Sequence, residues 1–184
     1  MTEHHVRALL AHIGEDPDRE GLRETPGRYV KALAEYTKGY SINPAELLKV
    51  FGDGAEGYDQ MVVVRDIPVY SLCEHHLAPF FGTATLAYLP HGKVVGLSKL
   101  ARVVDAYARR LQVQERLTTQ VADLIHQELQ PQGVGVVVRC RHLCMEARGI
   151  KASGTSTVTS ALRGALKDKP EAREEFLRLA REGL

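Results

Sequence analysis

The sequence predicts an α+β protein in which short helices precede an antiparallel sheet that carries two longer helices on one face. Apolar residues recur at helical spacing near the N-terminus and again over residues 98–129. Runs rich in β-branched and aromatic residues lie on both sides of that second helical segment. Strands joined by short turns favour antiparallel pairing, so the expected order is three helices, β-β-α-α-β-β and a final helix.

Residues 1–58 are expected to form an N-terminal helical region, followed by a larger α+β domain at 59–184. The first helix is predicted over residues 3–13, because the aliphatic side chains there recur on one helical face. Gly14 ends this helix, and a polar loop follows it.

Capping signals predict two further helices before the strands begin. Thr25 is expected to be the N-cap of the second helix, with Pro26 at its first position and an end near Lys38. Asn43 followed by Pro44 repeats this signal for a third, shorter helix.

Four strands are predicted, two on each side of the central helix pair. The first two cover residues 61–70 and 80–89 and are joined by a turn that contains cysteine and histidine. Residues 134–143 and 155–160 form the second pair, on the strength of their β-branched content. Such a sheet has one uncovered face and two open edges, which association into a ring would protect.

The central helices are predicted from their apolar faces. Ser98 is expected to cap the first, whose apolar face extends to Leu111. The second carries its apolar face from Leu117 to Leu129. A charged helix that opens at Pro170 is expected near the end of the chain.

The composition argues against several classes of protein. The chain has 184 residues, 44% of them hydrophobic and 26% charged, as is typical of a globular domain. A net charge of +1 gives no support for general binding to nucleic acid or to a membrane surface. No apolar run approaches the roughly 20 residues of a membrane-spanning helix, and three cysteines do not suit a secreted disulfide framework. We therefore expect a cytoplasmic protein with no nucleic-acid or membrane partner.

Cysteine and histidine are spaced for metal binding in the turn after the first strand. Two residues separate Cys73 from His76, and a turn lets both side chains converge on one ion. Cys144 would supply a third ligand and share a strand face with His142. Two thiolates and an imidazole suit zinc (Zn2+), with a fourth position left open as in catalytic zinc sites. Ordinary buried thiols beside a polar turn are the structural alternative.

Basic residues lie near the start of two predicted helices. A positive charge there is repelled by the helix dipole, which costs about 0.3 to 1 kcal/mol of stability for each residue. Lys99 and Arg102 follow the expected cap Ser98, and Arg28 and Lys31 hold the same place in the second N-terminal helix. A polyphosphate partner would explain both pairs, because helix N-termini already favour phosphate. Solvated surface charges are the alternative.

Further polar residues lie beside the metal ligands or between the central helices. Glu115 can accept two hydrogen bonds from the N1–H and 2-amino edge of guanine, or it can be an exposed residue at a helix start. His75 and His142 neighbour predicted ligands, where imidazoles suit either proton transfer or a structural role. Arg148 offers another contact to an anion.

Taken together, these motifs resemble those of the GTP cyclohydrolase I family. The matching segments keep the family's order along the chain and cover residues 24–28 with Lys31, 73–77, 96–102, 112–118, 142–144, 148–150 and 159–160. So many separate motifs in register make the resemblance specific.

The resemblance implies a tunnelling fold (T-fold) for the catalytic domain at 59–184. It implies a ring barrel, a homodecamer of two stacked pentamers with active sites between subunits. The expected reaction converts GTP and water to formate and 7,8-dihydroneopterin triphosphate, the first step of tetrahydrofolate (folate) or other pteridine biosynthesis. In that reaction zinc-bound water would attack C8 of guanine.

The resemblance also implies a role for each matched residue. The zinc ligands are Cys73, His76 and Cys144; the residues of proton transfer and rearrangement are His75, His142 and Ser98; the guanine-binding residues are Gln114 and Glu115; the triphosphate-binding residues are Lys99, Arg102 and Arg148, with Arg28 and Lys31 from a neighbouring subunit.

Three other functions stay open at the level of sequence. A different T-fold enzyme would use a cysteine nucleophile without zinc, or three histidine ligands, and neither pattern fits Cys73, His76 and Cys144. An enzyme that stops at a formylated, ring-opened intermediate would not need Ser98 and His142 for later steps. A zinc-stabilised nucleotide-binding module would need a fourth protein ligand.

Overall fold

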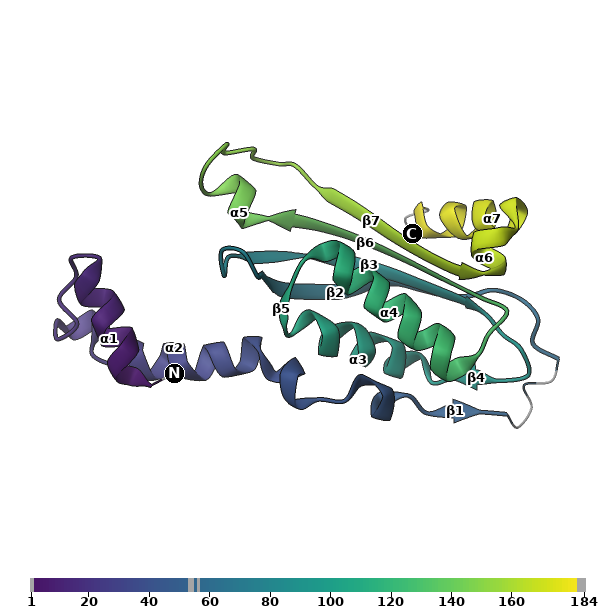
Figure 1. The fold of residues 1–184 in the computed structure, drawn as a ribbon, viewed down its shortest axis with the longest axis horizontal. Helices are drawn as coiled ribbons and strands as arrows, with labels where there is room; N and C mark the ends of the chain where they lie inside the picture. The colour runs from purple at the N-terminus through teal and green to yellow at the C-terminus, as the bar shows by residue number, and fades with distance from the viewer. Residues whose placement is uncertain (1, 53–54, 56, 182–184) are drawn as a thin grey trace.

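The computed structural model describes residues 2–52, 55 and 57–181, in which a twisted sheet is flanked by helices (Figure 1). The main elements follow the predicted order, and the α+β class is confirmed. The helices are α1 (Glu3–His12), η1 (Glu20–Leu22), α2 (Thr25–Tyr36), η2 (Lys38–Ser41), η3 (Pro44–Leu47), α3 (Leu97–Ala108), α4 (Gln114–Leu129), α5 (Leu143–Glu146), α6 (Ala165–Asp168) and α7 (Pro170–Arg181). The strands are β1 (Val50–Phe51), β2 (Val62–Cys73), β3 (Pro79–Leu89), β4 (Val94–Val95), β5 (Leu111–Gln112), β6 (Gly133–His142) and β7 (Thr157–Gly164).

The main sheet has the strand order β5-β2-β3-β6-β7. The four long strands pair antiparallel, as predicted. The fifth strand, β5, was not predicted, and it pairs parallel with the end of β2, with Leu111 opposite Leu72. It forms because α3 ends at Ala108, before the expected Leu111, and the chain then runs beside β2. The sheet is therefore mixed, and α4 starts directly after it, at Gln114.

Two helices, α2 and α3, begin one or more residues earlier in the chain than predicted, so the residue expected as the N-cap lies inside the helix. The N-cap of α3 is Gly96, whose carbonyl accepts a hydrogen bond from the backbone N–H of Lys99 at 2.8 Å. Ser98 consequently lies inside the first turn and is not the cap. Thr25 is the first residue of α2, and Glu24 is the N-cap. In neither helix does a side chain cap the first turn, so the capping pattern misplaced both starts.

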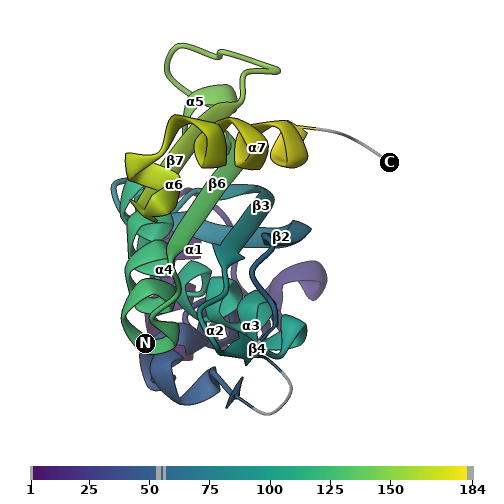
Figure 2. The same ribbon diagram turned by 90° about the vertical axis from the view of Figure 1, so that its right-hand side faces the viewer.

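Helices pack on both faces of the sheet. One face carries α3 and α4, and their contact with β2, β3 and β6 forms the larger core. The opposite face was expected to be uncovered, but α6 and α7 pack across part of it (Figure 2). Gly135 makes room for them, because a Cβ atom at this position would lie 2.7 Å from the ring of Phe176. What remains open on that face is the end of the sheet nearest to the turn between β2 and β3.

The N-terminal helices α1 and α2 form an arm that extends beyond the end of the sheet (Figure 1). The segment after the arm is attached to α3 through Gly39, whose N–H donates to the carbonyl of Arg109 at 2.9 Å. A Cβ at Gly39 would lie 2.1 Å from the carbonyl oxygen of Ala106, so this close approach requires glycine. Among the described residues, no helix combines the length and apolarity that crossing a membrane requires.

Candidate metal centre and active site

The turn between β2 and β3 brings Cys73 and His76 together. The N–H of Leu77 donates to the carbonyl of Cys73 at 2.8 Å, and the N–H of Cys73 donates to the carbonyl of Ala78 at 2.8 Å. Leu77 has a φ of 52°, a left-handed conformation that helps to reverse the chain. As a result, Cys73 Sγ lies 3.9 Å from His76 Nδ1.

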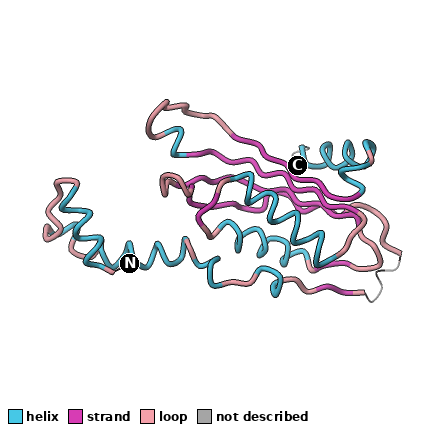
Figure 3. Tube along the Cα trace, in the orientation of Figure 1, coloured by secondary structure: helices cyan, strands magenta, loops and turns pink. Residues whose placement is uncertain are grey.

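Cys144 approaches this turn from the end of β6. The antiparallel register of β6 with β3 sets His142 opposite Phe80, at the start of β3. The loop after α5 and the turn between β2 and β3 lie at the same end of the sheet (Figure 3). The strand ends at His142, and the first turn of α5 then carries Cys144 toward Cys73 and His76. The prediction that Cys144 shares a strand face with His142 is therefore wrong, although the two remain close.

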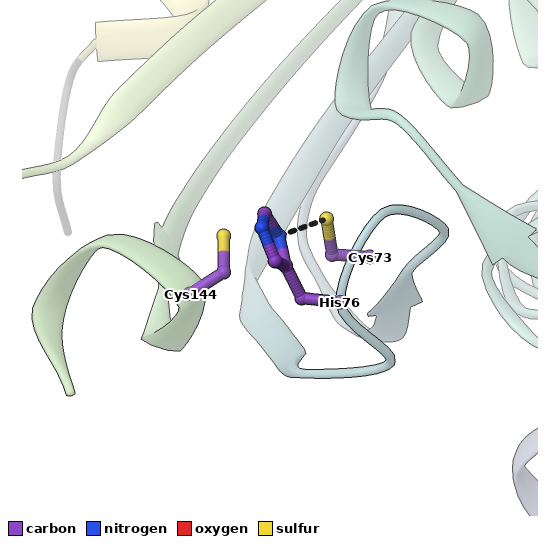
Figure 4. Close-up of side chains that lie close together, drawn as sticks. All are labelled: Cys73, His76 and Cys144. Atoms are coloured by element: carbon purple, nitrogen blue, oxygen red, sulfur yellow. Dashed lines mark hydrogen bonds between the residues drawn. The ribbon is translucent and has the colours of Figure 1, made fainter. Parts of the chain in front are cut away.

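The donor atoms of Cys73, His76 and Cys144 all lie within 4.8 Å of one another. In the view of Figure 4 the His76 ring lies between the two sulfur atoms. Cys73 is buried, Cys144 is half-buried and His76 is exposed, so the group opens to solvent on one side. Two thiols and an imidazole at this separation could hold a metal ion.

The electrostatics of the two thiols favour a bound cation. Burial raises the pKa of Cys144, and the nearby Cys73 raises it further, because two thiolates at this distance repel each other. A divalent cation would offset this repulsion, and soft sulfur and imidazole donors are those that zinc prefers. Within the part of the chain that the structure describes, the group contains three donor residues, which leaves a position for a non-protein ligand.

His142 lies next to this group in a defined orientation. Its ring stacks on Phe80, with centroids 4.7 Å apart and an interplanar angle of 6°. Its Nε2 lies 2.7 Å from Oε1 of Gln114. Burial lowers the pKa of His142, and the carboxylate of Glu115 partly opposes this shift. The imidazole is therefore neutral at neutral pH and available to exchange a proton.

The two residues matched to guanine binding occupy different environments. Gln114 is buried, with 1% of its surface exposed, and its amide bonds to groups inside the protein. Glu115 is exposed at the start of α4, where the helix dipole favours a carboxylate. The side chain of Glu115 is the one free to meet a ligand.

An ion pair that the sequence analysis missed ties the turn to α4. Both oxygens of the Glu74 carboxylate bond the guanidinium of Arg116, one of them at 2.9 Å from Nη2. The hydrogen bond from Arg116 lowers the pKa of Glu74. His75, also in the turn, has Nδ1 3.8 Å from Cys73 Sγ and an exposed ring. No local spacing relates Glu74 to Arg116, because 42 residues separate them.

Ser98, Lys99 and Arg102, all in the first half of α3, lie far from the Cys-His-Cys group of the same chain. Ser98 is near the start of α3, directly after β4, and the N–H of Val95 in β4 donates to the hydroxyl of Tyr88. Tyr88 is at one end of β3 and Phe80 at the other, about 25 Å apart at the rise of an extended strand. Figure 1 shows the start of α3 and the turn after β2 at opposite ends of the sheet. Within one chain, the start of α3 and the Cys-His-Cys group do not form one site.

The other basic residues differ in their distance from the group. Arg148 is exposed in the loop after α5, and its charge acts on the thiol of Cys144. Arg28 and Lys31 are exposed on the arm, and Arg28 pairs with Glu24. Arg148 therefore lies beside the Cys-His-Cys group, whereas Arg28 and Lys31 lie on the N-terminal arm.

These features define an α+β protein with a Cys-His-Cys group able to hold a metal ion beside a stacked, half-buried histidine. Comparison with known proteins is then decisive: the profile of the family described as GTP cyclohydrolase I matches residues 2–181. The chain belongs to this family of enzymes, and the resemblance inferred from its motifs is confirmed.

Individual relatives agree with the family profile. The chain is 63% identical to the GTP cyclohydrolase 1 of Janthinobacterium sp. (strain Marseille) over 176 residues, which cover 96% of this chain and 89% of that protein. It is 61% identical to the GTP cyclohydrolase 1 of Nitrosospira multiformis over 172 residues, covering 94% and 90%. A solved structure of the apo archaeosine synthase QueF-Like aligns with a TM-score of 0.46 and 20% identity over 56% of this chain and 93% of that one.

Proposed function

We propose that this enzyme converts GTP and water to formate and 7,8-dihydroneopterin triphosphate at a zinc site held by Cys73, His76 and Cys144. The observation that carries the proposal is the convergence of these three donors, within 4.8 Å of one another, next to His142. Membership of the family supports GTP as the substrate and pteridine or folate biosynthesis as the pathway. When bound, zinc would supply a Lewis acid that activates water for attack on C8 of guanine.

His142 and His75 are proposed to move protons around the guanine ring. His142 is neutral at neutral pH, so it can accept a proton and return it to the purine as the ring opens. His75 is exposed at the edge of the turn, where it can assist transfer to solvent. Ser98 and His142 would take part in the later rearrangement of the ribose and the closure of the pteridine ring.

Charge complementarity supports the assignment of the remaining residues. Glu115 is exposed and can accept both N–H groups of the guanine edge. The triphosphate would be bound by basic side chains from several elements: Lys99, Arg102, Arg148, Arg28 and Lys31.

The active site is proposed to form between subunits. Ser98 lies at the opposite end of the sheet from the Cys-His-Cys group of its own chain, beyond the length of β3, so a neighbouring chain would have to supply the start of α3. The arm that carries Arg28 and Lys31 projects from the domain and suits the same exchange. A ring of five chains would also cover the edge strands β5 and β7, and two stacked rings would give the homodecamer.

We also propose how the chain is divided and which compartment suits its thiols. Residues 59–184 are proposed as the catalytic T-fold domain, with 1–58 as the N-terminal region that extends it. A reducing compartment, the cytoplasm, would keep the thiols of Cys73 and Cys144 available for zinc.

The test is to incubate zinc-loaded protein with GTP, with and without a chelator, and to identify the products by mass spectrometry and a formate assay. Formate with dihydroneopterin triphosphate, both lost on chelation, is the expected result. A formylated ring-opened nucleotide would limit the enzyme to the first step. Unchanged GTP from an assembled, metal-loaded oligomer would overturn the proposed reaction.

A further inference from the structure

The amide of Gln114 is hydrogen-bonded at both ends inside the protein. Its Nε2 lies 3.0 Å from the carbonyl oxygen of Val138, 3.1 Å from that of Thr157 and 3.1 Å from Oγ1 of Thr159. Its Oε1 lies 2.7 Å from Nε2 of His142. Carbonyl oxygens only accept hydrogen bonds, so the end of the amide that faces Val138 and Thr157 must be the NH2 group.

A chain of hydroxyl groups imposes the same orientation independently. Oγ1 of Thr118 donates to the backbone carbonyl of Gln114 at 2.7 Å, and this acceptor cannot donate. The Thr118 oxygen, 2.6 Å from Oγ1 of Thr159, must then accept the hydrogen of Thr159. Oγ1 of Thr159 has then used its own hydrogen, so toward Nε2 of Gln114 it can only accept; the two hydrogens of that NH2 group are shared among this oxygen and the carbonyls of Val138 and Thr157. Each hydrogen in this cycle therefore has one allowed direction, and the amide cannot flip.

This orientation decides which nitrogen of His142 carries the proton. Since Oε1 of Gln114 is an acceptor only, Nε2 of His142 must donate to it. In the neutral ring the lone pair then lies on Nδ1. Stacking on Phe80 fixes the plane of the ring, so the direction of that lone pair is fixed as well.

We propose that Gln114 is a positioning residue that holds His142 as the Nε2–H tautomer, so that Nδ1 is the atom that exchanges a proton with the substrate. This inference rests on the proposed function only for the identity of the substrate. During the reaction, neutral His142 accepts a proton on Nδ1 and later gives the same proton to the purine. The hydrogen on Nε2 stays in place throughout. Gln114 therefore acts through His142, not through a contact with guanine.

The tautomer can be measured without any assay of activity. The zinc-loaded, full-length protein is labelled with 15N at its histidines, and imidazole nitrogen shifts are recorded by NMR at mildly alkaline pH. The spectrum of the His142→Asn variant identifies the signals of His142. A protonated Nε2 and an unprotonated Nδ1 are expected, whereas the opposite tautomer, or an even mixture of both, would overturn the proposal.

A kinetic comparison then separates positioning from guanine binding. Gln114→Met keeps the length of the side chain but removes both hydrogen-bonding ends, and we expect kcat to fall about 100-fold while KM for GTP changes less than about twofold. The His142 signals should become a mixture of tautomers. A raised KM with unchanged kcat would show instead that Gln114 binds guanine and would overturn the positioning role.

Two further variants keep the test interpretable. Thr159→Val breaks the hydroxyl cycle with little change of shape and should also lower kcat. It therefore serves as the test if Gln114→Met fails to fold. Thr85→Val is the matched control, because it removes a hydroxyl that is 9% exposed and lies on the other face of the sheet. A fall in kcat from Thr85→Val equal to that from Thr159→Val would contradict the inference. If the wild type makes no pteridine at all, the proposed reaction fails while the tautomer measurement still stands.

Discussion

At the scale of single residues, two cysteines four positions apart show how burial separates a core thiol from one that could hold a metal ion. Cys140 is 1% exposed in the core, where burial alone raises its pKa to about 12, so it stays protonated. Cys144 is half-buried beside Cys73 and Arg148, where a thiolate can form when a cation binds. The structure therefore assigns Cys140 to the core and places Cys144 where it can meet a metal ion.

Replacing each of these cysteines should give opposite results. Cys144→Ser is expected to lose bound zinc and activity together, because one of three donors is replaced by a weak ligand. Cys140→Ala should keep its zinc and lose about 1 to 2 kcal/mol of unfolding free energy through a small core cavity. Metal content per chain and urea unfolding measure the two effects. Loss of zinc from Cys140→Ala with zinc retained by Cys144→Ser would mean that the ligand is assigned wrongly.

Glu115 offers a second test at this scale. In Glu115→Gln one carboxylate oxygen becomes an NH2 group, which would face a donor of the guanine edge instead of accepting from it. We expect kcat/KM for GTP to fall about 100-fold, because one charge-assisted hydrogen bond is lost and its donor on guanine is left unpaired. Steady-state kinetics on GTP measure the change. Glu128→Gln, an exposed position at the other end of α4, is the control and should leave kcat/KM as it is.

At the scale of elements, the site depends on how the turn between β2 and β3 is held against α4. The ion pair of Glu74 and Arg116 joins them, and the N–H of Glu74 also donates to the carbonyl of Gln112 in β5 at 3.0 Å. The ion pair of Arg141 and Glu146 holds α5 to the end of β6, with 2.9 Å from Nε to Oε1. The two segments that carry the donors, the turn and α5, are therefore fixed by contacts outside the Cys-His-Cys group itself.

The pair of Glu74 and Arg116 makes a contribution to stability that depends on pH. The pKa of Glu74 is lower in the folded protein than in the unfolded chain, so the unfolded chain binds more protons as pH falls. The contribution is complete above the unfolded-state pKa and disappears as pH falls through the folded-state value. Arg116→Met should thus lower the thermal midpoint at neutral pH, and the difference from the wild type should shrink in acid.

This measurement is made on metal-free protein, so that acid release of zinc does not contribute. Lys93→Met, at an exposed position with no ion-pair partner among the described residues, provides the control. A difference between Arg116→Met and wild type that stays constant from neutral to acid pH would show that the ion pair is not its cause.

At the scale of the whole molecule, the two parts of the proposed site lie at opposite ends of the sheet. The Cys-His-Cys group lies at the end of the sheet where β3 starts, and the start of α3 lies beyond the other end of that strand. A complete site therefore requires at least two chains if Lys99 acts as proposed. Closed rings supply such pairs of surfaces by symmetry.

Mixing two inactive variants tests this arrangement. Cys144→Ser lacks the metal end, and Lys99→Ala lacks the phosphate-binding end. Co-assembled in equal amounts, they should regain about one quarter of wild-type activity, because about one quarter of random sites combine an intact half from each of two neighbours. Each variant assembled separately is the control. No recovery in verified mixed oligomers would place both halves of the site in one chain.

Local patterns predicted much of the fold and part of the site. The order of the long elements followed from periodicity, since a buried face repeats at the period of its helix or strand. Cys73 and His76 were recognisable because a turn brings near neighbours together. The same reasoning misplaced the starts of α2 and α3, because neither start uses the side-chain cap that was expected from Thr25 or Ser98.

The sequence by itself determined the family, the class of fold and the residue types of a group that could hold a metal ion, since each is written in local spacing and in motifs kept in order. Only the tertiary structure decided that Gln114 faces His142 across 28 residues of chain, and that Arg116 holds Glu74 across 42. It also separated the start of α3 from the metal ligands by the length of a strand. These relations depend on strand register and helix packing, which relate residues far apart in the chain and leave no periodic signal in it.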